Sequence, residues 1–306
     1  MKRLFTILIG LVLAGFVFSA SIAKAEGGMQ ISPVTFNFQV NPGETDSGQI
    51  TLKNLNTETI NYSIDVELFN KVSDEGAPSF EQTLPQEGVT TLSDWITYTP
   101  KEGTIEPQQS VTIDFTISIP QGAEPGGHYA AVFAKQLNKT PDGKTQLGVT
   151  TRVGSLVLVS VPGDVKKSVS LKDFLISKFV WRGPVSMSAK VQNTGSVHYD
   201  SQVKVALKPL FGASSEVDLG KHTVIPKNER NFEGSWGKKY PFGYYKLTAS
   251  ASDGDGKFSS TSETSVFALP LIIVIPLLAV ILIILLVTKY VKKNFKLVKA
   301  RPTHED

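Results

Sequence analysis

Residues able to do chemistry are few in this chain and lie far apart. The four histidines follow no H-x-H or H-x-x-x-H spacing, so a metal site would need a coincidence of folding, and we expect structural or surface roles for His128, His198, His222 and His304. Asp253-Gly-Asp255-Gly resembles the beginning of a calcium loop, but it has neither a third oxygen ligand nor a distal glutamate. This segment is therefore predicted to be a hairpin turn.

The sequence also lacks the signatures of the common enzyme classes. It has no G-x-S-x-G elbow, no P-loop and no dinucleotide-binding fingerprint, and no pair of carboxylates has a recognisable spacing. Because the chain has no cysteine, thiol catalysis, zinc–thiolate sites, a disulfide scaffold and a lipid anchor on an N-terminal cysteine are excluded. We expect a protein that is not an enzyme and that holds neither a cofactor nor a metal.

Aromatic residues are the best candidates for binding. Trp95 and Tyr98 are flanked by Asp94 and Glu102, a set that can line a sugar-binding cleft, although burial of Trp95 in a strand is the stronger interpretation. A second aromatic set would make a protein or glycan contact surface if several members were exposed. We expect its two tryptophans to fill a sandwich core instead. The set comprises Trp181, Trp236, Tyr240, Phe242, Tyr244 and Tyr245, and the candidate binding surface is Trp95, Trp236 and Tyr244.

The first 25 residues have the pattern of a secretory signal peptide. Lys2 and Arg3 precede an apolar stretch over residues 4–20, and Ala23 and Ala25 form an A-x-A cleavage site. An uncleaved membrane anchor is the alternative, but glycine and serine interrupt the apolar stretch. We expect export, with cleavage after Ala25.

A second apolar segment, predicted as a transmembrane helix over residues 266–288, is long enough to cross a membrane. Its first 22 residues carry no charge, and about 20 helical residues suffice. Pro270 fits a first turn, whereas Pro276 is expected to kink the helix, which a membrane tolerates. The alternative, a core helix of a soluble protein, would need a large protein around it.

The basic residues that follow this segment predict its orientation. Lysine and arginine concentrate on the cytoplasmic side of membrane proteins, so residues 289–306 are expected to form a cytoplasmic tail and the N-terminal domains to be extracellular. The tail can also hold anionic lipid headgroups. The cluster consists of Lys289, Lys292, Lys293, Lys296, Lys299 and Arg301.

The net charge of +3 comes from the two ends of the chain. Residues 1–25 and 289–306 hold nine basic and two acidic residues, which leaves 22 basic and 26 acidic residues in the body. A nucleic-acid-binding body would need a clustered basic surface, so we expect no nucleic-acid partner.

The body of the chain has the period of β-strands. In Val111–Ile119 every odd position is apolar and every even position polar, which predicts a half-buried strand. Turn signals such as Asn41-Pro-Gly-Glu44 separate such strands, and Asn54 and Asn193 are expected where strands exit. Short strands at this spacing predict an all-β fold of two immunoglobulin-like β-sandwich domains, at residues 26–163 and 164–265.

The first of these domains contains a longer, less regular insert at Lys71–Ser93. Its glycines and prolines favour a loop over a strand. Such an insert is either a binding loop or merely a mobile one, and the sequence favours the second interpretation.

Several motifs of the first domain resemble a known family. They are Val40-Asn-Pro-Gly-Glu44, Gly48-Gln-Ile-Thr-Leu-Lys-Asn54, Ile105-Glu-Pro-Gln-Gln-Ser-Val-Thr112, Ile119-Pro-Gln-Gly-Ala-Glu-Pro-Gly-Gly-His-Tyr-Ala130 and Arg152-Val-Gly-Ser-Leu-Val157. Together they resemble the N-terminal domain of the WxL-interacting-protein family of monoderm bacterial surface proteins. That resemblance implies a peptidoglycan-binding, immunoglobulin-like sandwich, in a chain with a signal peptide, two β domains, one C-terminal helix and a short basic tail.

The second domain is similar to the generic immunoglobulin-like domains that precede such anchors. Its motifs are Val191-Gln-Asn-Thr-Gly-Ser-Val-His198, Val224-Ile-Pro-Lys227 and Pro241-Phe-Gly-Tyr-Tyr245, and they match the family's second, host-binding domain less clearly. The resemblance covers about 240 residues. Because most of its motifs are turn chemistry that many exported sandwiches share, it supports fold and topology more strongly than ligand.

Three functional classes remain open at this stage. The first is a membrane-anchored surface protein that binds a cell-wall polymer such as peptidoglycan, or another surface protein, through loops or an open sheet edge. The second is an accessory structural subunit of a membrane-associated envelope complex, whose anchor and tail carry the specific contacts. The third, an enzyme, would require carboxylates that converge in a cleft.

Overall fold

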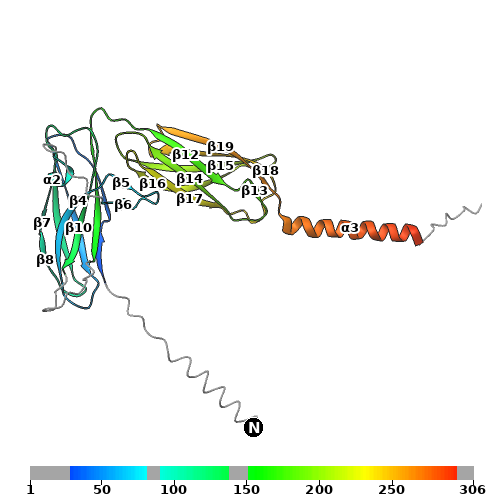
Figure 1. The fold of residues 1–306 in the computed structure, drawn as a ribbon, viewed down its shortest axis with the longest axis horizontal. Helices are drawn as coiled ribbons and strands as arrows, with labels where there is room; N and C mark the ends of the chain where they lie inside the picture. Colours follow the sequence, from blue (N-terminus) through cyan, green and yellow to red (C-terminus); the bar gives the residue numbers. More distant parts are fainter. Residues whose placement is uncertain (1–27, 81–89, 138–150, 295–306) are drawn as a thin grey trace, which may run out of the picture.

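Two β-sandwiches followed by one long helix make up the part of the protein that the structure describes (Figure 1). The structure is a computed structural model that describes residues 28–80, 90–137 and 151–294. The predicted signal peptide with Ala23 and Ala25 lies outside the described residues, as do Lys296, Lys299 and Arg301. The predicted all-β class with two immunoglobulin-like sandwiches is confirmed.

Sandwich 1 packs a four-stranded sheet against a five-stranded one. In spatial order the four-stranded sheet contains β1 (Met29–Ser32), β3 (Thr45–Asn54), β9 (Ser110–Ser118) and β7 (Ile96–Thr99), and the five-stranded sheet contains β2 (Thr35–Gln39), β11 (Arg152–Val161), β10 (Gly126–Leu137), β4 (Ile60–Leu68) and β8 (Glu102–Ile105). The alternation predicted for β9 is confirmed, because Ile113, Phe115 and Ile117 are buried while Thr112 and Asp114 are exposed. These side chains join the core between the two sheets.

Sandwich 2 has a three-stranded and a five-stranded sheet. The first contains β12 (Val169–Ile176), β14 (Val185–Asn193) and β17 (Glu229–Trp236), and the second contains β13 (Phe179–Val180), β19 (Ser259–Ala268), β18 (Gly243–Asp253), β15 (Tyr199–Pro209) and β16 (Ser215–Val224). Both sandwiches split their first strand between the two sheets. β1 and β12 pair antiparallel with β3 and β14, whereas β2 and β13 run parallel to β11 and β19. The hairpin turn predicted at Asp253 connects β18 to β19 and is confirmed.

A buried asparagine occupies the same place in each sandwich. Asn54 ends β3 and Asn193 ends β14, and each pairs with the first residue of the neighbouring strand. Both are fully buried, and in both the side-chain amide donates two hydrogen bonds to backbone carbonyls of nearby turns. The predicted ends of strands at these residues are confirmed. Each asparagine side chain hydrogen-bonds the end of its own strand to neighbouring segments of backbone.

The predicted insert at Lys71–Ser93 is more regular than the sequence indicates. β5 (Lys71–Val72) and β6 (Pro78–Ser79) form a hairpin, while residues 81–89 lie outside the described part. The chain then forms α2 (Leu92–Trp95). The expectation of a strand at Trp95 is wrong, because the carboxylate of Asp94 accepts the backbone N–H of Thr91 at 2.8 Å and so begins a helical turn. The predicted burial of Trp95 is confirmed, with 5% of the residue exposed.

The expectation that both tryptophans of the second aromatic set fill a core is wrong for one of them. Trp236 is 6% exposed, but Trp181 is 52% exposed. In the two-residue strand β13, Val180 occupies the inward position, and the chain turns away from the sheet directly after it. Trp181 therefore lies on the surface.

The apolar helix α3 (Leu271–Asn294) begins later than the predicted start at residue 266. Val266 and Ala268 are buried in β19, with Phe267 exposed between them, because an apolar run can end a strand as well as begin a helix. Pro270 lies between β19 and α3, and its carbonyl accepts the N–H groups of Ile273 and Val274 in the first turn of the helix. By length and composition α3 is suited to crossing a membrane, and none of its apolar window is buried against the described part of the protein.

Candidate functional site

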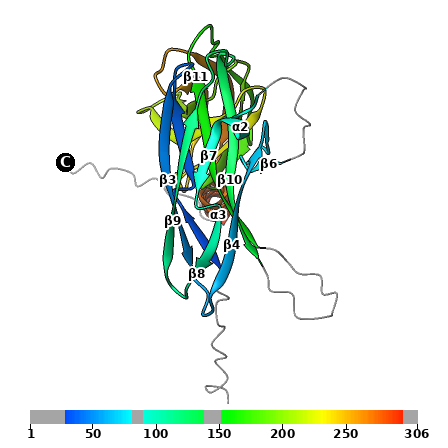
Figure 2. The same cartoon turned by 90° about the vertical axis from the view of Figure 1, so that its left-hand side faces the viewer.

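The β5–β6 hairpin connects the two sandwiches. It belongs to sandwich 1 by sequence and lies, like α2, in the upper half of that sandwich (Figure 2). The hairpin extends from there toward sandwich 2 (Figure 1). The side-chain amide of Asn228, in sandwich 2, donates to the carbonyl of Asn70 at 2.9 Å and accepts the N–H of Val72 at 2.9 Å. At the hairpin tip, the carbonyl of Asp74 accepts the N–H of Asn231 at 2.7 Å, and its carboxylate pairs with Lys190 at 2.8 Å.

A small apolar cluster lies beneath the hairpin. Phe69, Tyr129 and Leu158 of sandwich 1 pack with Ile225 of sandwich 2, and Phe80 lies at the edge of the cluster. The cluster is separate from the two sandwich cores, and Ile225 is its one buried member from sandwich 2, so it adds an apolar contact across the junction.

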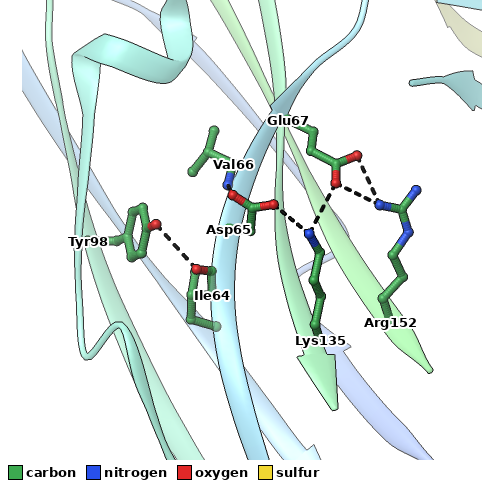
Figure 3. A network of polar contacts seen from close by, with 7 residues as sticks. All are labelled: Ile64, Asp65, Val66, Glu67, Tyr98, Lys135 and Arg152. Atoms are coloured by element: carbon green, nitrogen blue, oxygen red, sulfur yellow. Dashed lines mark hydrogen bonds and ion pairs between the residues drawn. The ribbon is translucent and has the colours of Figure 1, made fainter. Parts of the chain in front are cut away.

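Polar contacts on the face of sandwich 1 hold the chain where it leaves the hairpin. Figure 3 shows Glu67 between Lys135 and Arg152, at 3.4 and 2.8 Å, with Lys135 also paired to Asp65. The guanidinium of Arg152 lies 5.6 Å from the ring centroid of Phe80, which follows β6. Because these ion pairs are partly exposed, each is worth about 1 kcal/mol or less. Arg152 is the member of this network that contacts the hairpin exit, and it also lies 4.2 Å from the ring centroid of Phe133.

His198 makes a second connection between the sandwiches. Its Nε2 donates to the side-chain oxygen of Asn37 at 2.8 Å, and its Nδ1 accepts the hydroxyl of Tyr129 at 3.2 Å. The same hydroxyl accepts the backbone N–H of His198 at 3.1 Å. Burial lowers the pKa of His198 to about 4 and raises the pKa of Tyr129, so both side chains are neutral near pH 7. The neutral imidazole satisfies both of its nitrogens.

Glycine allows a third, backbone contact between the sandwiches. The N–H of Gly127 donates to the carbonyl of Ser196 at 3.0 Å. Gly126, immediately before it, has φ +137, and a Cβ there would lie 3.0 Å from the same carbonyl oxygen. The positive φ of Gly126, which glycine adopts readily, places the start of β10 directly against sandwich 2.

The substitution Asn228→Ala tests how firmly the hairpin is held. It leaves the N–H of Val72 and the carbonyl of Asn70 without partners, which should lower the free energy of local opening by about 2 kcal/mol. We expect amide hydrogen exchange at Val72 to become about 30-fold faster. Asn231→Ala is the matched control, because its backbone N–H still reaches Asp74. Equal exchange rates in the two variants would contradict the assigned role of Asn228.

A groove runs from α2 to the junction and is the candidate binding site. It consists of two adjoining hollows of about 460 and 510 Å³, which share Asn70, Glu124 and His128 as lining residues. The ring of His128 lies 4.7 Å from that of Trp95, and its Nε2 bonds the carbonyl of Glu124 at 2.9 Å. Threonine hydroxyls line the α2 side, and sandwich 2 lines the other end. Aromatic rings beside converging amide and hydroxyl groups can bind sugars or short peptide segments.

A second cleft, on another side of the junction, is less suited to binding. Its lining includes Asp200, Lys221, Lys167 and Asp255. These charges neutralise one another, because Lys221 lies 3.1 Å from Asp200 and Lys167 lies 3.8 Å from Asp255. The groove beside α2 is therefore the better candidate.

The structure does not bring the three predicted binding residues together. Trp95 lines the groove at one end of sandwich 1 but shows little surface, and Trp236 is buried against Tyr245 with ring centroids 4.7 Å apart. Tyr244 is 47% exposed at the end of sandwich 2 next to α3. Asp94 caps α2, and Glu102 lies in β8, away from the groove lining.

Sequence reasoning assigned no binding role to His128 or His198. The sequence does place both beside turn motifs, at Gly-Gly-His128 and at Gly-Ser-Val-His198. Local sequence gives no sign that these two turns meet in the fold.

Comparisons with known proteins match the fold only. No protein-family model matches this chain, and no curated protein matches it. Among solved structures, a chaperone–tip adhesin complex of CFA/I fimbriae biogenesis is 13% identical with a TM-score of 0.40, over 78% of this chain and 98% of that chain. The class 5 fimbriae chaperone CfaA is 13% identical with a TM-score of 0.38, over 78% and 99%. The E. coli chaperone DraB is 13% identical with a TM-score of 0.36, over 79% and 98%.

These similarities are too distant to assign a partner or an activity. The strand topology itself defines the class, which is a two-domain immunoglobulin-like β-sandwich protein with one C-terminal apolar helix.

Proposed function

We propose that this chain is a non-enzymatic, single-pass protein of the cell membrane, whose two extracellular sandwiches bind a cell-wall polymer or a surface protein. One observation carries the proposal: α3 is a long apolar helix that none of the described protein covers, and it follows β19 almost directly. Exposed apolar surface of this length is stable in a bilayer and not in water. Lys289, Lys292 and Lys293 at the end of α3 support a cytoplasmic tail.

The groove between α2 and the junction is the proposed binding site. Glu124 and Lys227 are exposed at its rim, so it offers both charges beside the Trp95–His128 pair. Peptidoglycan, which the resemblance to the WxL-interacting-protein family implies for the first domain, carries sugars, amides and carboxylates that this combination can bind. A surface protein presenting an extended segment is the other candidate ligand.

Filling the groove should abolish binding while leaving the fold intact. Gly122 lines the groove, and a Cβ at this position would meet nothing within 4 Å, so Gly122→Trp adds an indole there without a backbone clash. We expect full-length protein in nanodiscs to co-sediment saturably with purified cell wall, and Gly122→Trp to lose at least tenfold in affinity, about 1.4 kcal/mol. Gly28→Trp is the matched control, because Gly28 also has free space and precedes β1, away from the groove.

Two further results would redirect the proposal. Wall binding that Gly122→Trp does not weaken would move the site out of the groove. Replacing α3 by an unrelated transmembrane helix should leave binding unchanged. Loss of binding on that replacement would favour an accessory subunit of an envelope complex, in which the anchor itself makes the specific contacts.

A further inference from the structure

Strongly exposed aromatic side chains gather at the end of sandwich 2 from which α3 leaves. Figure 1 shows this end, where β13 and β18 lie next to α3. Among the described residues of the two sandwiches, Phe258 is the only strongly exposed phenylalanine that lies elsewhere. We call the group the collar; it consists of Phe179, Trp181, Phe211, Phe242, Tyr244 and Phe267, which are 47% to 87% exposed.

Strand register explains why these side chains meet. Phe267 pairs with Phe179 on one side and with Tyr244 on the other, so three adjacent strands present aromatic rings on the outer face of one sheet. The rings of Phe179 and Phe267 stack with centroids 6.1 Å apart. The β15–β16 loop, which carries Phe211, is held at the same end because the N–H of Leu210 donates to the carbonyl of Tyr244.

The collar lies next to the start of α3. β19 ends at Ala268 and α3 begins at Leu271, so two residues connect them. The N–H of Leu269 donates to the carbonyl of Val180 at 2.8 Å, which fixes even this short link to β13. Two residues span at most about 7 Å. If α3 crosses a membrane, the collar must therefore lie at the membrane surface.

Basic residues predominate at this end. Segments 177–184, 208–214 and 237–246 contain no acidic residue, and their basic residues are all exposed: Lys178, Arg182, Lys208, Lys238, Lys239 and Lys246. Of these, Lys246 is paired with Glu263 of β19 at 2.9 Å. Aromatic and basic side chains together are the composition that binds the headgroup layer of a bilayer with anionic lipids. Monomeric soluble proteins rarely expose an apolar group of this size without a partner.

We propose that the collar is a lipid-binding surface, which inserts into the headgroup layer of the leaflet that α3 enters and binds anionic phospholipids there. The proposal rests on the proposed membrane anchorage. The aromatic rings bury apolar surface among the headgroups, and the lysine and arginine side chains reach the phosphates. Sandwich 2 is thereby held in one orientation relative to the membrane and does not rotate about the two-residue link to α3.

Single labelled cysteines test the proposal, because the chain has no cysteine of its own. Full-length protein is reconstituted into phosphatidylcholine vesicles containing phosphatidylglycerol, with an environment-sensitive dye at Ala213→Cys, which lies two residues from Phe211. Ser259→Cys, exposed at the other end of sandwich 2, is the matched control, and Leu282→Cys reports on α3. We expect lipids brominated near the headgroup to quench the dye at residue 213 but not at residue 259. Lipids brominated near the ends of their acyl chains should quench the dye at residue 282, which lies near the middle of α3.

Each basic residue that is removed next to the collar should weaken the docking of sandwich 2 on the membrane by a similar factor. In the double variant Lys178→Gln/Lys239→Gln, the ratio of docked to undocked protein should fall about fivefold for each charge removed. For the unsubstituted protein, vesicles of phosphatidylcholine alone, which contain no anionic lipid, should lower the ratio of docked to undocked protein to a comparable extent.

The outcomes separate the two proposals. A quenched dye at residue 282 with no quenching at residue 213 would overturn the collar proposal and leave the anchor intact. The collar would then be free for a protein partner. An unquenched dye at residue 282 would overturn the membrane anchor and the collar proposal with it.

Discussion

The substitution Asn193→Ala is expected to lower the free energy of unfolding of sandwich 2 by about 3 to 5 kcal/mol. Asn193 is fully buried at the end of β14. Its Nδ2 donates to the carbonyls of Val197 and Val224, both at 2.9 Å, and its Oδ1 accepts the N–H of Gly195 at 2.8 Å. Alanine leaves three buried backbone groups without partners, at about 1 to 3 kcal/mol each.

The neighbouring substitution Thr194→Ala is the matched control. The Thr194 hydroxyl bonds Ser168 at an exposed position, so its loss should cost less than about 1 kcal/mol. Urea unfolding followed by tryptophan fluorescence separates the sandwiches, because Trp181 and Trp236 report on sandwich 2 and Trp95 on sandwich 1. Equal stabilities of the two variants would show that water replaces the asparagine, and would contradict the role assigned to it.

The sequence predicts those features of the fold that depend on local periodicity. The alternation around Phe115, the strand exits at Asn54 and Asn193 and the turn at Asp253 all follow from residues within a few positions of one another. The start of α3 was misplaced because Val266 and Ala268 are equally apolar in a strand and in a helix. Trp181 was misplaced because a two-residue strand gives no period from which to infer its inner face.

The junction could not be predicted, because it depends on contacts between residues far apart in the chain. Asn228 bonds Val72 across 156 positions, and His198 bonds Asn37 across 161. Neither residue has a local pattern that distinguishes it from an ordinary turn residue. The candidate groove depends on the same contacts, so only its tryptophan was found from the sequence.

Together, the junction and the proposed contact of the collar with the membrane determine how far from the membrane the groove lies. β18 has 11 residues and runs from the collar to the junction, a length of about 35 Å. If the collar lies at the membrane as proposed, the hairpin and His198 hold sandwich 1 at about that height with a fixed orientation. A binding protein that must reach a polymer at a set distance from the membrane benefits from such rigidity, because no ordering entropy is lost on binding.

Stability at the junction should fall as the pH falls from 6.5 to 4. Burial lowers the pKa of His198 to about 4, with nearby Lys167 acting in the same direction and Asp200 opposing it. Protonation would place a hydrogen on Nδ1, which now accepts the hydroxyl of Tyr129. That hydroxyl already accepts the backbone N–H of His198, so the charged ring loses an acceptor and gains no partner of opposite charge in direct contact.

The sign of the effect follows from proton binding. The unfolded state, with a histidine pKa near 6.5, binds the proton more tightly than the folded state, so the contribution of His198 is complete above pH 6.5 and is lost progressively down to about pH 4. The full loss is about 3 kcal/mol. His198→Gln cannot be protonated, so whatever its stability at pH 7, its stability should depend less on pH across this interval by that amount.

Urea unfolding at a series of pH values measures this difference. His222→Gln is the control, because burial lowers the pKa of His222 in the same direction while its ring packs against Phe232 inside sandwich 2. Loss of His198 should flatten the pH dependence of the junction, seen as a lower protection factor of the Val72 amide in acid for wild type but not for His198→Gln. The His222 variant should keep that response at Val72. Parallel curves for wild type and His198→Gln would show that His198 has the same pKa in the folded and the unfolded protein, which would contradict the lowered pKa assigned to it.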